Sequence, residues 1–78
     1  MQIISEREAE ETVVQVNQII NALGEEDKNK IPVNVRSFFK VNAKNIERYM
    51  LDLSKPFEVQ NISGITKTML KYIYSYVK

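Results

Sequence analysis

The chain has 78 residues, no cysteine, no histidine and a net charge of +1. This length predicts one domain, residues 1–78, with a thin hydrophobic core. The lack of cysteine excludes a disulfide bond, and the lack of histidine argues against a metal centre. We therefore expect helix packing, alone or with self-association, to stabilise the fold.

Several features predict a cytoplasmic protein without a membrane span. A chain without cysteine shows no adaptation to an oxidising compartment. Acidic residues follow the first five residues at once, and the basic start and long apolar stretch of a signal peptide are missing. No unbroken apolar run exceeds three residues, which is far too short to cross a bilayer.

The first predicted element is a helix from Ser5 to Leu23. Ser5 and Glu8 have the spacing of a capping box, in which two side chains satisfy free backbone N–H groups. An apolar stripe at steps of three and four consists of Ala9, Val13, Val16, Ile20 and Leu23. Val14 lies apart from this stripe, so it is either exposed or in contact with a neighbouring element. Gly24 offers the left-handed residue that commonly ends a helix.

The next segments are shorter. Residues 25–30 place acids before bases, which favours a single helical turn. Pro32 disfavours helix before it and can open the next helix, which we expect from Val33. That helix should break near residues 42–45, where two asparagines weaken the pattern. Residues 46–53 fit both a continued helix and a short extended stretch. The apolar positions with helical spacing here are Val35, Phe38, Phe39 and Ala43.

A turn and an extended arm precede the last helix. Pro56 excludes helix before it, and residues 57–61 then form the arm. Ser63 caps the last helix, which spans Gly64 to Val77. The residues expected to pin the arm to the core are Phe57, Val59 and Ile62.

The last helix has an unusually wide apolar side. Its apolar positions cover roughly 200° of the helical wheel, whereas a one-sided surface helix shows a stripe of about 100°. A helix packed centrally between two others explains this width, and exposure of its tyrosines to a partner or a second copy is the alternative. The apolar positions are Ile65, Met69, Leu70, Tyr72, Ile73, Tyr74, Tyr76 and Val77. A narrow line of lysines occupies the remainder, namely Lys67, Lys71 and Lys78.

Together these elements predict an all-α fold. We expect a small bundle of three main helices plus a short helical turn, with an extended connection before the last helix. Packing of the apolar faces should bury one core. The predicted core residues are Val13, Val16, Ile20, Phe38, Phe39, Met69 and Ile73.

The pattern of turns in residues 25–76 gives a further expectation. The residues that carry it are Ile31-Pro32, Phe38-Phe39, Lys55-Pro56-Phe57, Gln60-Asn61-Ile62-Ser63 and Thr66. In this pattern the chain resembles a group of short, uncharacterised bacterial helical proteins. The resemblance implies a compact helical fold with an extended connection before the last helix, and it transfers no catalytic or ligand-binding residue. Gly64 and Ile65 depart from the pattern, which has an acidic first turn there.

No residue pattern indicates catalysis or cofactor binding. Acid–base and nucleophilic catalysis most often use histidine, cysteine or an activated serine, and no plausible base lies near a serine in the sequence. The two glycines stand alone, which argues against a phosphate loop, and residues 25–27 lack the alternating ligands of a calcium loop. We expect no enzyme activity, no cofactor and no metal.

Charges divide unevenly along the chain. Residues 1–27 carry seven acids and one base, a net charge of −6, and residues 28–78 carry ten bases and three acids, a net charge of +7. The two halves can neutralise each other in the fold, or the basic half can face an acidic partner. If the helix from Val33 continued, one basic stripe suited to nucleic acid would consist of Arg36, Lys40, Lys44 and Arg48. The total charge near zero argues against a dedicated nucleic-acid binder.

The leading hypothesis is a non-enzymatic protein-binding or regulatory module, and the alternative is an accessory nucleic-acid binder that uses the basic stripe. The candidate partner-binding residues are Leu70, Tyr72, Tyr74, Tyr76, Lys67 and Lys71. Leu70 and Tyr74 border the lysine line, so they should remain exposed in a monomer. A homodimer about a two-fold axis would bury them, with Glu10 or Glu11 of the second copy near the lysines.

Overall fold

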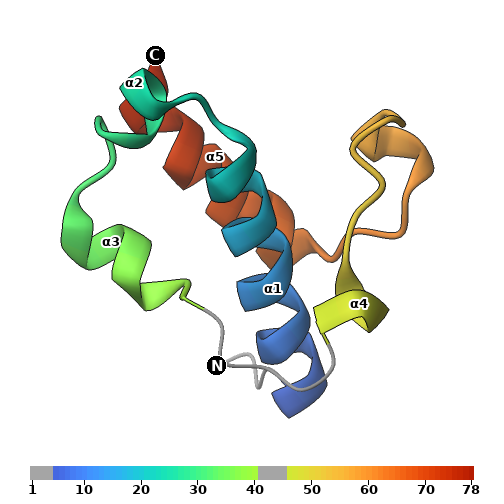
Figure 1. Ribbon diagram of the computed structural model, residues 1–78. Helices are drawn as coiled ribbons and strands as arrows, with labels where there is room; N and C mark the ends of the chain where they lie inside the picture. Colours follow the sequence, from blue (N-terminus) through green and yellow to red (C-terminus); the bar gives the residue numbers. More distant parts are fainter. Residues whose placement is uncertain (1–4, 41–45) are drawn as a thin grey trace.

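The computed structural model describes residues 5–40 and 46–78 (Figure 1). These residues form helices and no β-strand, which confirms the predicted all-α class. The elements are α1 Glu6–Ala22, α2 Glu25–Lys28, α3 Val33–Phe38, α4 Ile46–Tyr49, the 3₁₀ turn η1 Phe57–Val59, and α5 Gly64–Val77. Only α1 and α5 are long, and α3 has six residues, so the described residues do not show the expected three main helices. Neither long helix combines the length and apolar composition that a membrane span requires, and the shorter described helices do not either.

Serine caps set the start of both long helices. The backbone N–H of Glu8 donates to Ser5 Oγ over 3.1 Å, and the backbone N–H of Thr66 donates to Ser63 Oγ over 3.1 Å. Each bond satisfies an N–H group that has no partner within the first helical turn. The predicted starts of α1 and α5 are therefore confirmed.

The predicted role of Gly24 at the end of α1 is wrong. The helix ends at the cap residue Leu23, and Gly24 has a φ of −64°, which any residue can adopt. The Gly24 carbonyl accepts the backbone N–H of Lys28 over 2.9 Å, a bond that closes the single turn of α2. Because the chain passes directly from one helix into the next, no left-handed residue is required.

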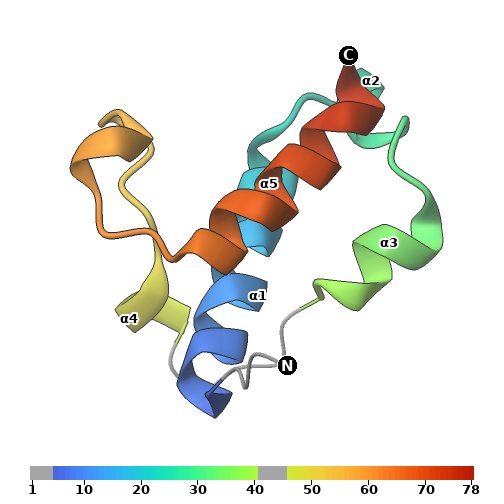
Figure 2. The ribbon, with the colours of Figure 1, turned by 180° about the vertical axis from the view of Figure 1, so that it is seen from behind.

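The two long helices organise the molecule. α1 and α5 pack side by side and run toward the same end, where α2 and the C-terminus also lie (Figures 1 and 2). α3 lies on one side of this pair, and residues 46–62 lie on the other. Both flanking segments contribute side chains to the core between the long helices.

The hydrophobic core draws on both long helices, α3, η1 and the segments between them, and on no residue of α2 or α4. Its buried cluster consists of Val16, Ile19, Ile20, Ile31, Phe39, Leu51, Ile62, Leu70 and Ile73. The core prediction is confirmed for Val16, Ile20, Phe39 and Ile73. Val13 and Met69 pack against the cluster and are only partly buried.

The predicted burial of Phe38 is wrong. The Phe38 side chain is 73% exposed, whereas Phe39 is 4% exposed. α3 ends at Phe38, and successive helical residues point about 100° apart, so the core receives only one of the two rings. The Phe38 ring instead meets the Phe39 ring edge to face, with 5.1 Å between the ring centroids.

α1 is buried over a wider side than its apolar stripe predicts. Val14 is 2% exposed and Gln15 is 3% exposed, while Ala9, inside the predicted stripe, is exposed. The cause is a second neighbour, because α4 and the residues after it cover another side of α1. On the side that meets α5, the hydroxyls of Thr12 and Thr66 form a buried hydrogen bond of 3.0 Å.

Two glutamines of α1 hold the segment that follows α4. Gln15 Nε2 donates to the Tyr49 carbonyl over 3.1 Å. Gln18 binds both backbone groups of Leu51, since its Nε2 donates to the carbonyl and its Oε1 accepts the N–H, each over 2.7 Å. These side chains replace helical hydrogen bonds. The sequence left open whether residues 46–53 are helical or extended. With these side-chain bonds in place, the chain is helical up to Tyr49 and non-helical at Leu51.

The arm before α5 contacts the core at two of its three predicted residues. Ile62 is buried and Phe57 is partly buried, whereas Val59 is 71% exposed, so the prediction for Val59 is wrong. Both Phe57 and Val59 belong to the 3₁₀ turn η1, where residues two apart point in different directions. Gln60 fixes the arm, because it accepts the Asp52 N–H and donates to the Asp52 carbonyl, each over 2.8 Å.

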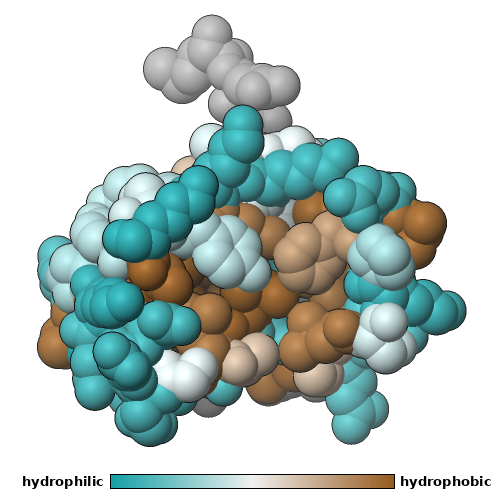
Figure 3. Space-filling model, turned by 90° about the horizontal axis from the view of Figure 1, so that it is seen from above, coloured by the Kyte–Doolittle hydropathy of each residue, from teal (hydrophilic) through white to brown (hydrophobic). Residues whose placement is uncertain are grey.

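The core reaches the surface at one end of the molecule. Seen from the end that carries α2 and the C-terminus, hydrophobic residues gather in the middle of the face, and hydrophilic residues form most of its rim (Figure 3). A chain of this size buries a smaller share of its surface than a larger domain does. The partly buried apolar residues around the core are Val13, Leu23, Val35, Phe57, Met69, Tyr74, Tyr76 and Val77.

Candidate functional site

The predicted partner-binding residues of α5 separate into buried and exposed sets. Lys67, Lys71 and Tyr72 are exposed, and Tyr74 and Tyr76 are partly buried. Leu70 is 5% exposed, so the expectation that it stays exposed in a monomer is wrong. It lies three residues before the fully buried Ile73, so the neighbours that cover one side chain also cover the other.

Most of the wide apolar side of α5 is therefore ordinary core. Tyr72, which is 50% exposed, is the large side chain that points outward. We define the α5 outer face as the exposed residues Lys67, Thr68, Lys71, Tyr72, Ser75 and Lys78. The sequence from Gly64 to Lys78 contains no acidic residue. This face thus combines positive charge, hydroxyl groups and one aromatic ring.

A tyrosine pair fixes the aromatic part of this face. The hydroxyls of Tyr72 and Tyr76 form a hydrogen bond of 2.7 Å, and their rings meet edge to face with centroids 5.3 Å apart. This hydrogen bond is the main cause that raises the pKa of Tyr76 above its usual value, and burial and the neighbouring Tyr72 charge act in the same direction. These two contacts orient the Tyr72 ring against Tyr76.

Replacement of Tyr72 with phenylalanine should lower the pKa of Tyr76 toward 10.0, because the hydrogen bond is lost. In the native protein the Tyr72–Tyr76 hydrogen bond raises the Tyr76 pKa above 10.0, so the bond stabilises the fold while Tyr76 is protonated. This stabilisation is fully present below pH 10.0 and is lost as the pH rises through the folded pKa of Tyr76. An NMR pH titration of isotope-labelled tyrosine measures the shift. Tyr74→Phe is the control, and an unchanged Tyr76 pKa in Tyr72→Phe would contradict the pairing.

The basic residues of the alternative hypothesis do not share one helix. α3 ends at Phe38 and the next described helix begins at Ile46, while Lys44 lies outside the described residues. Arg36 is tied to its own segment, because its Nε donates to the Ile31 carbonyl over 3.1 Å. Arg48 lies on α4. The condition for one basic stripe, a helix that continues from Val33 through Lys40, is therefore not met.

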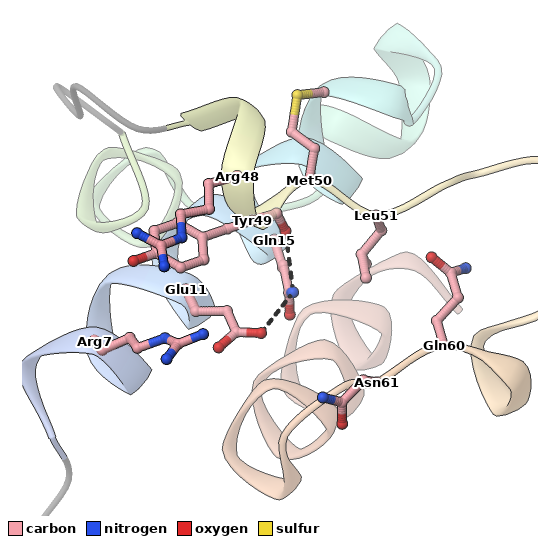
Figure 4. Close-up of a pocket in the computed structure, with 9 residues that line it drawn as sticks. All are labelled: Arg7, Glu11, Gln15, Arg48, Tyr49, Met50, Leu51, Gln60 and Asn61. Carbon is pink, nitrogen blue, oxygen red and sulfur yellow. Dashed lines mark hydrogen bonds between the residues drawn. The ribbon is translucent and has the colours of Figure 1, made fainter.

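Arg48 instead lines a polar pocket of about 410 Å³ between α1, α4 and the arm (Figure 4). The residues that line it are Arg7, Glu11, Gln15, Arg48, Tyr49, Met50, Leu51, Gln60 and Asn61. Charged and amide groups predominate, and Met50 and Leu51 add an apolar wall. No local pattern in the sequence predicts this pocket, because its residues come from three separate segments.

Gln15 is the buried polar residue of this pocket. Its Nε2 donates to Glu11 Oε1 over 3.2 Å and to the Tyr49 carbonyl over 3.1 Å, as the dashed lines in Figure 4 show. Both partners are acceptors, which fixes the orientation of the amide and leaves Gln15 Oε1 buried without a hydrogen-bond partner. The sequence contains one signal that could have indicated this pocket, namely the two amide side chains Gln15 and Gln18 at the border of the apolar stripe.

The pocket has room for a small polar group. It contains no histidine or cysteine, and the described residues contain no cluster of three acidic, histidine or cysteine side chains that could hold a metal ion. Comparison with protein-family models, curated proteins and solved structures found no match. The resemblance to short bacterial helical proteins therefore stays a prediction.

Proposed function

We propose that this protein is a non-enzymatic binding module that holds an acidic segment of a partner protein on the α5 outer face. The observation that carries the proposal is the composition of this face. Lys67 and Lys71 are exposed, Tyr72 is held half exposed by its bond to Tyr76, and α5 carries no acidic residue. Lysines attract carboxylates, while a fixed tyrosine supplies contact area at a low entropic cost.

The side-chain inventory supports a role without catalysis. The sequence has neither histidine nor cysteine, the residues most often used as catalytic bases and nucleophiles. Several hydroxyls already serve the local backbone. The serines whose side chains form such local hydrogen bonds are Ser5, Ser63 and Ser75.

A protein partner fits this face better than the alternatives do. A dedicated nucleic-acid binder is usually strongly basic, and this chain has a net charge of +1. The reason to expect a homodimer was the wide apolar side of α5, and Leu70, one of the two residues expected to stay exposed there, is 5% exposed. The exposed charged and aromatic residues of the α5 outer face are lysines and one tyrosine, and they complement an acidic segment.

An NMR titration with a synthetic glutamate-rich peptide tests the proposal, with the same peptide carrying glutamine in place of glutamate as the control ligand. We expect shifts at Lys67, Lys71 and Tyr72. The double variant Lys67→Gln/Lys71→Gln should bind about 3–10 times more weakly, since each exposed charge pair contributes only a fraction of a kcal/mol to about 1 kcal/mol. The matched control, Lys28→Gln/Lys40→Gln, makes the same change of charge outside α5.

Three results would contradict the proposal. The first is equal binding of the acidic peptide to both double variants. The second is tight, steeply salt-dependent binding of single-stranded RNA or DNA, which would favour the alternative of an accessory nucleic-acid binder. The third is a mass that rises with concentration in sedimentation equilibrium and falls back in Lys67→Gln/Lys71→Gln, which would place a second copy on this face.

A further inference from the structure

A second pocket lies on the other side of α1, between α1, α2 and α3, with a volume of about 330 Å³. Figures 1 and 2 show α3 on the side of α1 opposite residues 46–62, so this pocket is separate from the one around Gln15. Its polar lining residues are Asn17, Asn21, Lys28, Arg36, Ser37 and Lys40. Three of these are cations, and no carboxylate lines the pocket.

The three cations come from different parts of the fold. Lys28 belongs to α2, Arg36 belongs to α3, and Lys40 follows the end of α3. Among the described residues, Lys28 has one weak ion pair, 3.7 Å from the largely exposed Glu25, and neither Arg36 nor Lys40 has an ion pair. In the part of the chain that the structure describes, the positive charge of Arg36 and Lys40 is thus not neutralised by an ion pair, that of Lys28 is neutralised only weakly, and a concave wall concentrates the charge.

The guanidinium group of Arg36 is oriented in advance. Its Nε donates to the Ile31 carbonyl over 3.1 Å, which leaves the two terminal nitrogens for a ligand. Arg36 is partly buried, so water screens it less than a fully exposed arginine. A planar fork of this kind binds phosphate oxygens in pairs, and lysine ammonium groups add point charges around it.

Neutral donors complete the lining. Asn21 Nδ2 donates to Asn17 Oδ1 over 3.0 Å. This bond uses the oxygen of the Asn17 amide and not its nitrogen, so Asn17 Nδ2 can donate to an anion in the pocket. Ser37 supplies an exposed hydroxyl from α3. An anion in the pocket would therefore meet both charged and uncharged hydrogen-bond donors, which is the combination that binds phosphoryl oxygens.

We propose that this pocket binds a phosphate-bearing small ligand, most simply one with a diphosphate group. Three separated cations call for more negative charge than one carboxylate provides, and each phosphoryl group carries between one and two negative charges. The same chemistry occurs along a nucleic-acid backbone. The small concave site and the net charge of +1 favour a free ligand. This proposal uses none of the residues of the α5 outer face.

An NMR titration with inorganic pyrophosphate tests the proposal. We expect shifts at Asn21, Ser37 and Lys40, and no comparable shifts on α5. The variant Lys28→Gln/Lys40→Gln should bind pyrophosphate at least about ten times more weakly, whereas Lys67→Gln/Lys71→Gln should bind it as the native protein does. The two double variants thus test the two proposals independently, and thermal unfolding of each shows that the fold is retained.

Two further ligands separate the possible sources of binding. A single-stranded oligonucleotide that binds more weakly than pyrophosphate supports a free ligand, and one that binds more tightly, with a steep dependence on salt, overturns it. Citrate carries several charges without phosphoryl groups, so citrate binding as tight as pyrophosphate binding would also overturn the proposal. Pyrophosphate shifts centred on the α5 lysines, or equal binding by both double variants, would do the same.

Discussion

Replacement of Phe39 with alanine should lower the free energy of unfolding by about 3–5 kcal/mol. Phe39 is 4% exposed and belongs to the central cluster, where it packs among side chains from both long helices. Its removal takes away buried apolar surface and leaves a cavity that the fold fills only in part. In so small a domain this loss approaches the whole stability, so denaturant unfolding should show a largely unfolded protein under mild conditions.

Phe38→Ala is the matched control for this experiment. The residue is adjacent, has the same chemistry and is 73% exposed, so its removal should cost no more than the edge-to-face contact with Phe39, about 0.5–1.5 kcal/mol. A larger loss of stability for Phe38→Ala than for Phe39→Ala would mean that the two rings have been assigned to the wrong sides of α3.

The second large effect is expected from Gln18→Met. Methionine has a similar length and a similar helix propensity, so the change mainly removes the amide that binds both backbone groups of Leu51. Each of these two groups would lose its partner in a partly buried place, at a cost of about 1–2 kcal/mol each. The free energy of unfolding should therefore fall by about 2–4 kcal/mol.

A local measurement identifies the cause of this loss. Hydrogen exchange at the Leu51 amide should accelerate more than exchange at Ile73 in the core, since the Gln18 bond protects the Leu51 N–H directly. Asn21→Met serves as the control on the same helix, because Asn21 is exposed and, within residues 5–40 and 46–78, its side chain bonds to Asn17 alone, over 3.0 Å. Unchanged protection of the Leu51 amide in Gln18→Met would contradict the stabilising role of the two hydrogen bonds between Gln18 and Leu51.

Local signals in the sequence predicted the helices well. Ser5 and Ser63 mark the starts of α1 and α5, and the structure places their hydroxyls on the expected backbone N–H groups. These signals succeed because a cap is an interaction between residues three apart, which the sequence alone specifies. For the same reason the single turn at residues 25–28 followed from nearby residues. The predicted break near residues 42–45 lies outside the described residues.

The side that each helix buries was harder to predict. Leu70 and Phe38 were assigned to the wrong sides, and Val14 and Gln15 are buried outside the apolar stripe of α1. A helical wheel gives the angles between side chains, but the neighbours decide which of those angles are covered. α4 and the residues after it pack against α1 as a second neighbour. No local pattern in the sequence predicts this contact.

The pockets depended most on tertiary structure. The amides of Gln15 and Gln18 fasten a segment more than thirty residues away, and Lys28, Arg36 and Lys40 line one pocket because α2 and α3 fold back beside α1. The sequence by itself determined the all-α class, the ends of the long helices and the acid-free composition of α5. Only the tertiary structure decided which side chains are buried and which polar groups meet, because both depend on contacts between residues far apart in the chain.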